Sequence, residues 1–156
     1  MPEAPAYDER LTVPLRWWAL ATMFAASILV AFLVAVPAWL ALAGTGVLVL
    51  AIGSLLVGYG AARVSVRDGV LTAGRARIPV DHVGVVQALD AEGTRLLAGR
   101  EADARAYLLI RPYLRAAVRV DITDPADPTP YWLICTRHPR RLTAALTEAR
   151  ARATGG

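Results

Sequence analysis

The reactive side chains of this sequence are few, and the first pair to consider is Cys135 with His138. A cysteine and a histidine three residues apart could form a thiol–imidazole pair or half of a zinc site. Because Cys135 is the only cysteine, a four-ligand zinc site would need other kinds of ligand, and no intramolecular disulfide can form. On a strand over 131–136, Cys135 alternates with Tyr131 and Leu133 on one face. This placement favours a small buried hydrophobic residue over a catalytic thiol.

Two further polar positions could take part in chemistry. Asp81 and His82 lie between two expected strands, where a general base and an ordinary polar turn are the alternatives. Asp124 and Asp127 belong to the segment DPADPTP. In such turns an aspartate more often bonds to its own backbone than to a metal ion. We therefore expect no catalytic residue, no cofactor and no metal site, and the protein is expected not to be an enzyme.

Arginine is the better functional lead. The chain carries 17 basic residues, all of them Arg, and has a formal net charge of +4. In a domain anchored beside an anionic leaflet, each Arg near the surface contributes about 1 kcal/mol of attraction. Such residues could face lipid headgroups or a protein partner, or could be ordinary solvated strand residues. The candidates are Arg63, Arg67, Arg75, Arg77, Arg111, Arg115 and Arg119. No nucleic acid partner is expected, because no aromatic–basic binding motif is evident.

The arginines can lie beside a membrane only if part of the chain anchors them there. The candidate anchor is an apolar block, residues 17–62, which contains no charged residue. A bilayer span needs about 20 apolar residues, so the block is long enough for spans over 17–36 and 39–60 with a turn at Pro37. A signal peptide is the alternative, but its apolar region would be about 7–15 residues long. The sequence therefore predicts a helical hairpin that crosses the membrane twice.

The flanks of this hairpin predict its orientation. Arginines lie only at its open end, so the positive-inside rule predicts that both termini are cytoplasmic at the plasma membrane. Small residues at four-residue spacing predict close packing of the two spans, with a seam to another protein as the alternative. The expected interface anchors are Arg16, Trp17, Trp18 and Trp39, and the expected packing residues are Ser27, Ala31, Ala35, Ser54 and Gly58.

The remaining sequence predicts one small domain. Residues 1–16 are expected to form a cytoplasmic segment, loosely ordered over 1–9, and residues 63–156 alternate in a pattern typical of short strands. Asp68-Gly69 is a strong hairpin signal, and Asp90 can cap a short helix that ends near Ala98. An amphipathic helix is expected over 139–152. The expected strands are 63–67, 70–73, 75–80, 82–89, 106–112, 116–122 and 131–136.

About seven antiparallel strands closed by one C-terminal helix predict an α+β fold beside the membrane hairpin. The order of elements resembles a pleckstrin-homology-like (PH-like) domain, and a split β-sandwich fits the same pattern. Strand alternation places Tyr131 and Trp132 on opposite faces. Both could be buried only if the sheet were covered on two sides.

Several phrases, taken in order, carry a resemblance to a known family: YDERLTVPLRWW, GRARIPVDHVG, RAYLLIRPYLRAAVRV and DPADPTPYWLICTRHPRRL. Together they resemble the actinobacterial membrane proteins called domain of unknown function 3093, over about Tyr7 to Leu146. The resemblance implies a plasma-membrane protein with two spans and brings no activity. Our hypothesis is a membrane-anchored adaptor without catalysis that binds a protein partner or anionic lipid. A small membrane enzyme, or an accessory subunit of an envelope complex, is the alternative.

Overall fold

The computed structural model describes residues 6–154, which form two compact units. Thr12–Ala61 form a helical hairpin. The strand that precedes the hairpin and the residues from Ala62 onward form a β domain.

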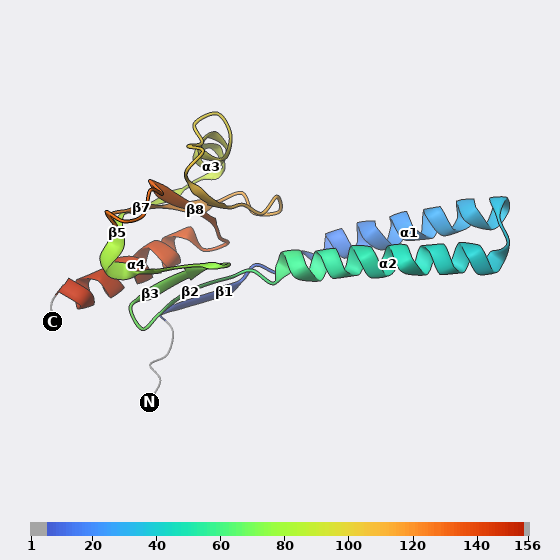
Figure 1. Cartoon of the computed structure of the whole chain (residues 1–156), viewed down its shortest axis with the longest axis horizontal. Helices are drawn as coiled ribbons and strands as arrows, with labels where there is room; N and C mark the ends of the chain where they lie inside the picture. The colour runs from blue at the N-terminus through green and yellow to red at the C-terminus, as the bar shows by residue number, and fades with distance from the viewer. Residues whose placement is uncertain (1–5, 155–156) are drawn as a thin grey trace. The chain divides into compact units, whose positions relative to one another are not determined.

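The hairpin consists of α1 (Leu15–Ala35) and α2 (Ala38–Gly60), joined at Val36 and Pro37 as predicted (Figure 1). Pro37 has an extended backbone (φ −54°, ψ 141°) and immediately precedes α2, a position that suits proline because helix starts do not need its missing N–H. Both helices are long and apolar enough to cross a membrane. Their large apolar side chains are mostly exposed, and Leu50, for example, is 73% exposed.

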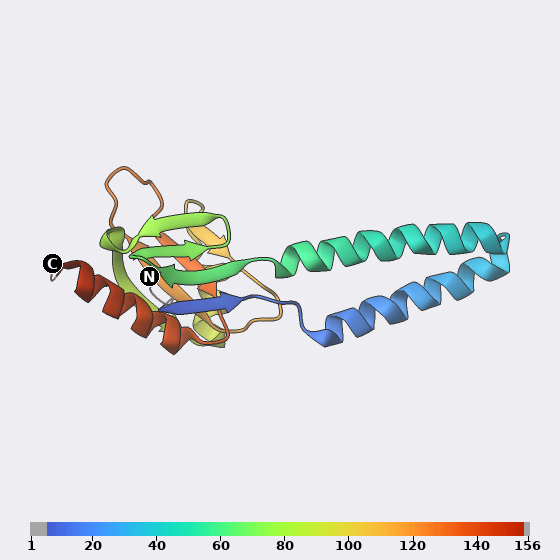
Figure 2. The ribbon, with the colours of Figure 1, turned by 90° about the horizontal axis from the view of Figure 1, so that it is seen from below.

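The first sheet of the β domain contains strands from both sides of the hairpin. Its order is β1 (Tyr7–Arg10), β2 (Arg63–Arg67), β3 (Val70–Ala73) and β4 (Ala76–Pro79), and every pair is antiparallel (Figure 2). The Leu11 N–H donates a 2.9 Å hydrogen bond to the Ala62 carbonyl just beyond the β1–β2 pair. The hairpin is therefore an insertion between two neighbouring strands.

For residues 7–11, this pairing corrects the expectation of a loosely ordered segment that is separate from the β domain. Tyr7 and Glu9 face the domain interior, and Asp8 and Arg10 are exposed. Residues 1–5 lie outside the described residues. The predicted Asp-Gly turn is confirmed, with left-handed φ values of 50° at Asp68 and 70° at Gly69.

The second sheet has the order β5-β7-β8-β6. Its members are β5 (Val83–Leu89), β6 (Tyr107–Leu109), β7 (Ala117–Ile122) and β8 (Tyr131–Cys135), and two short helices, η1 (Val80–His82) and α3 (Ala91–Ala98), precede β5 and follow it. Strands β6 and β8 are parallel, which corrects the expectation of a wholly antiparallel domain. Strand β7 occupies one side of β8 and runs antiparallel to it. The long connection from β5 through α3 brings β6 to the other side of β8, where it runs in the same direction as β8. Within residues 6–154 the strands number eight rather than about seven.

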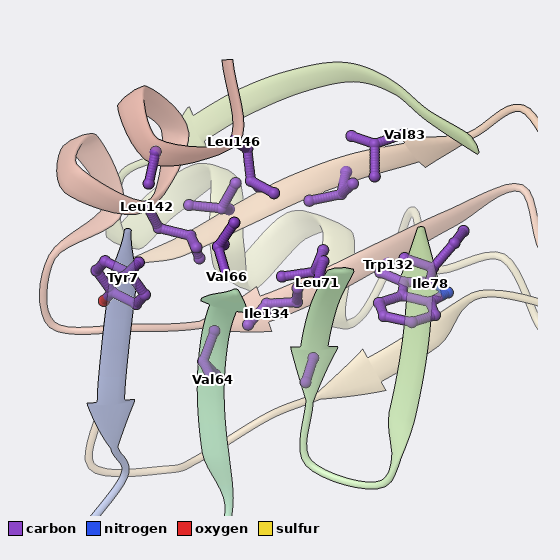
Figure 3. Close-up of a cluster of buried hydrophobic side chains, with 14 of the residues drawn as sticks. Tyr7, Val64, Val66, Leu71, Ile78, Val83, Trp132, Ile134, Leu142 and Leu146 are labelled. Atoms are coloured by element: carbon purple, nitrogen blue, oxygen red, sulfur yellow. The ribbon is translucent and has the colours of Figure 1, made fainter. Parts of the chain in front are cut away.

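The main core lies between the inner faces of the two sheets and the C-terminal helix α4 (Pro139–Thr154). Figure 3 shows side chains from β1 to β4 pointing toward those of β5, β8 and α4. Leu142 and Leu146 on α4 are fully buried there. The α+β class and the closing amphipathic helix are thus confirmed.

Strand β8 is buried on both faces. Trp132 (4% exposed) lies in the main core, whereas Tyr131 (5% exposed) lies in a second apolar cluster with Leu133 and Cys135. Leu97 and Ala98 of α3 pack against this second cluster. Helix α3 and its neighbouring loops therefore provide the second cover that burial of both aromatic residues requires.

Candidate functional site

Cys135 and His138 are in different environments. Cys135 is fully buried in the second cluster, and burial raises the pKa of its thiol. His138 is exposed, and its backbone N–H donates a 3.0 Å hydrogen bond to the Thr136 hydroxyl just before α4. Within the described residues, no three His, Cys, Asp or Glu side chains are grouped so that they could hold a metal ion. This geometry offers no thiol–imidazole pair.

The two aspartates of the proline-rich loop bond to their own backbone, as expected. Asp124 accepts from the Ala126 N–H and Asp127 from the Thr129 N–H, each at 2.9 Å. The bonds from Thr129 lower the pKa of Asp127. Asp81 is exposed and His82 is half-buried in η1.

A buried carboxylate that the sequence reasoning missed ties β1 to the junction of β8 and α4. Glu9 is 8% exposed and accepts hydrogen bonds from the Tyr7 and Thr136 hydroxyls, each at 2.5 Å, and from the Arg137 N–H at 3.1 Å. The Arg137 guanidinium lies 3.5 Å from the same carboxylate. Burial and the bond to Glu9 raise the pKa of the Tyr7 phenol far above its usual value. The network therefore joins the strand that precedes the hairpin to the residues that follow β8.

Six arginines gather at the end of the β domain from which the chain leaves for the hairpin. We call this set the arginine collar: Arg10, Arg63, Arg75, Arg111, Arg115 and Arg137. Arg10 and Arg63 are paired in register at the end of β1 and the start of β2. The Gly74 N–H donates to the Arg63 carbonyl at 2.9 Å, which holds the turn containing Arg75 at the same end.

Two side-chain hydrogen bonds bring the rest of the collar to this end. The buried Tyr113 hydroxyl donates to the Leu11 carbonyl at 2.5 Å and so fixes the loop that contains Arg111 and Arg115. The Arg137 guanidinium donates to the Arg10 carbonyl at 3.1 Å. All collar residues are exposed except Arg111, which is half-buried.

The acidic residues closest to the collar in sequence are already engaged. Asp8 forms a two-point ion pair with Arg63, in which the Arg63 Nε lies 2.6 Å from the Asp8 carboxylate. Hydrogen bonding from Arg63 lowers the pKa of Asp8. Glu9 is buried against Arg137. These acids neutralise part of the collar, and its surface remains rich in guanidinium groups.

The other three candidate arginines lie elsewhere. Arg67 ends β2 at the opposite end of the first sheet, beside the Asp68–Gly69 turn, and Arg77 lies on the edge strand β4 opposite Thr72. Arg119 forms a 2.8 Å ion pair with Asp121 and lies 4.6 Å from the centre of the Tyr131 ring. The structure therefore brings together four of the seven candidates and adds Arg10 and Arg137, which were not among them.

In the hairpin, the residues predicted to pack the two helices together are not buried. Ser27, Ala31, Ala35, Ser54 and Gly58 are all exposed, and a Cβ atom at Gly58 would meet nothing within 4 Å. The buried residues are instead Ala25 on α1 and Ala41 and Thr45 on α2. Spacing alone could not show which face of each apolar helix meets the other. Of the expected interface anchors, Arg16, Trp18 and Trp39 are exposed and Trp17 is half-buried.

The family described as "Protein of unknown function (DUF3093)" matches residues 6–146, from the start of β1 into α4. The chain belongs to this family. No curated protein and no solved structure matches it significantly. The DUF3093 match covers both flanks of the hairpin, so it spans the inserted helices and the β domain together.

Proposed function

We propose that this DUF3093 protein is a two-pass plasma-membrane protein whose cytoplasmic β domain binds anionic lipid headgroups through the arginine collar, without catalysis. The observation that carries the proposal is the Tyr113–Leu11 hydrogen bond. It holds the loop of Arg111 and Arg115 at the residue from which the chain enters the hairpin. The collar arginines thus come from β1, β2, the turn after β3, the loop between β6 and β7, and the turn after β8, and all lie at the same end of the domain.

The electrostatic argument rests on chain connectivity. Arg63 follows the last residue of α2 by three positions, and Arg10 precedes the first residue of α1 by five. Basic residues this close in sequence to a span are attracted to the anionic cytoplasmic leaflet by about 1 kcal/mol each, and salt screens the attraction. The absence of charge at the Pro37 turn supports a cytoplasmic location for the open end of the hairpin.

The fold is part of the proposal. Two packed sheets followed by a helix that closes the core support a PH-like arrangement, with the hairpin inserted between its first two strands. In this account the hairpin is the anchor, and the β domain is an adaptor module.

The test uses the full chain in nanodiscs of phosphatidylcholine, alone or with one-third phosphatidylglycerol. Anionic lipid should raise the midpoint for urea unfolding of the β domain, because a ligand that binds the folded state stabilises it. Arg10→Gln with Arg75→Gln should lower this gain, because two of the six collar charges are removed, and added salt should lower it as well. The charge-matched control, Arg67→Gln with Arg77→Gln, should keep it. Equal losses in the two double variants, or no gain in the wild type, would contradict the proposal.

A protein partner is the competing outcome. It would appear as a partner captured equally from neutral and anionic membranes and lost in the collar variant.

A further inference from the structure

A hollow of about 770 Å³ lies between α3 and the loop that joins β6 to β7. Its lining includes Thr94 and Arg95 from α3, Arg111 and Arg115 from the loop, and Cys135 of β8. It shares two arginines with the collar, but Thr94, Arg95 and Cys135 belong to the hollow alone.

The walls of this hollow are fixed by contacts within the β domain. Asp90 caps α3 by accepting the Gly93 N–H at 2.8 Å, and Leu97 and Ala98 hold the helix on the second apolar cluster. On the other wall, the Leu114 N–H donates to the Arg111 carbonyl at 2.9 Å and forms a turn. The bond from Tyr113 to Leu11 anchors that turn. One wall of the hollow is therefore a capped helix, and the other is a loop held by two hydrogen bonds.

The polar groups of the lining suit an anion. The lining contains three arginines and one acidic residue, Glu92, so its formal charge is positive. A planar guanidinium group can donate two parallel hydrogen bonds to two oxygens of one phosphate group. Thr94 is 6% exposed, and its hydroxyl has no hydrogen-bond partner among the described residues. A buried hydroxyl without a partner is unfavourable, and a ligand oxygen at the wall of the hollow would supply the missing bond.

We propose that this hollow binds a phosphate monoester group, held by Arg95, Arg111 and Arg115 with the Thr94 hydroxyl. A phosphate monoester carries about −1.5 to −2 charges at pH 7, which balances three guanidinium groups and one carboxylate. A simple carboxylate would leave positive charge uncompensated. Ile110 and Leu114 also line the hollow and can contact the apolar part of an ester. The phosphate could belong to a lipid headgroup or to a soluble molecule.

The experiment uses the full chain in phosphatidylcholine nanodiscs and separates these two sources. In one arm, inorganic phosphate replaces chloride stepwise at constant ionic strength. In the other, one-third of the lipid is phosphatidic acid, whose headgroup is a phosphate monoester, and the reference is one-third phosphatidylglycerol, which is anionic but a phosphate diester. A rise in the thermal midpoint in the first arm supports a site open to soluble phosphate. A rise above the phosphatidylglycerol reference in the second arm alone supports a lipid headgroup, and no such rise in either arm overturns the proposal.

Two variants test the assigned residues. Arg95→Gln should weaken phosphate binding by about tenfold or more, as expected for the loss of a charge-assisted hydrogen bond. Thr94→Val should weaken binding while leaving the ligand-free protein as stable as before or more stable, because it removes an unpartnered hydroxyl. Thr94→Val that destabilises the ligand-free protein and leaves binding intact would overturn the role of this residue.

The control is Arg75→Gln, which removes a collar charge outside the hollow. It should leave the affinity for inorganic phosphate unchanged. An equal loss of affinity in Arg75→Gln and Arg95→Gln would show general charge attraction and would overturn the site. The phosphate site and the proposed lipid contact of the collar can therefore fail separately.

Discussion

The Thr136 hydroxyl donates a 2.5 Å hydrogen bond to the Glu9 carboxylate, although 127 residues separate the two positions in the chain. One partner precedes the helical hairpin, and the other follows the last strand of the β domain. Because Tyr7 and Arg137 also bond to Glu9, a single carboxylate joins β1 to the start of α4. The first strand is thus a structural part of the domain that the hairpin interrupts.

Replacing Glu9 should destabilise the β domain strongly. Glu9→Ala leaves the Thr136 hydroxyl and the Arg137 N–H without their acceptor, and each buried donor left unsatisfied typically costs about 1–3 kcal/mol. Urea unfolding of the full chain, followed by tryptophan fluorescence, measures this loss. Asp8→Asn is the matched control on the exposed face of the same strand and should change the midpoint little. Equal effects of the two substitutions would contradict the network's role.

The hairpin should be removable without loss of the β domain. Leu11 and Ala62 are joined by a 2.9 Å backbone hydrogen bond, so Asn-Gly in place of Thr12–Ala61 would close β1 and β2 with a favoured two-residue turn. We expect a soluble protein with a cooperative unfolding transition and dispersed amide resonances. A fragment that begins at Ala62 lacks β1 and should be much less stable. If the two proteins were equally stable, β1 would not be integral to the domain.

The buried Tyr7 phenol should make the free energy of unfolding of the β domain fall at alkaline pH. Its pKa is raised in the folded state, first by burial and then by its bond to Glu9. The contribution is complete below the unfolded pKa of about 10 and is lost above it, by about 1.4 kcal/mol for each pH unit. Tyr7→Phe should start less stable, and the gap in stability to the wild type should stay constant up to about pH 9 and narrow as the pH rises above about 10. A constant gap would show that the phenol ionises normally.

Helix α4 should be essential for the main core. Leu146 is fully buried, and Leu146→Ala should cost about 2–5 kcal/mol through lost contacts and a residual cavity. Leu108, which is 36% exposed on β6, provides the control. Leu108→Ala should have a much smaller effect on the urea midpoint. Similar losses at both positions would mean that α4 contributes no more than a surface contact.

Local patterns predicted most of the elements. The apolar block, Pro37, the Asp68–Gly69 turn and the Asp90 cap are local signals, and each corresponds to an observed element. Strand β1 was missed because the residue at its second inward position, Glu9, is charged and hides the period-two pattern. Its burial depends on Thr136 and Arg137, which no short window of sequence contains.

The candidate site was predictable only in part for the same reason. Arginines at 63, 75, 111 and 115 were candidates by charge alone. Their gathering at one end depends on the Tyr113–Leu11 bond and on the pairing of β1 with β2. Arg119 looked equivalent in sequence, but Asp121 and Tyr131 engage it within the domain. In the hairpin, many small residues recur at four-residue spacing, so spacing could not select Ala25, Ala41 and Thr45 as the buried ones.

Photo-crosslinking from the collar to lipid tests directly whether the collar faces the membrane. The full chain is reconstituted in vesicles that contain phosphatidylglycerol, with p-benzoylphenylalanine in place of either Arg75 or Arg67. We expect abundant lipid adducts from position 75, in the collar, and few from position 67, at the opposite end of the first sheet. Equal lipid labelling from both positions, or labelling from position 67 alone, would contradict the claim that the collar faces the membrane.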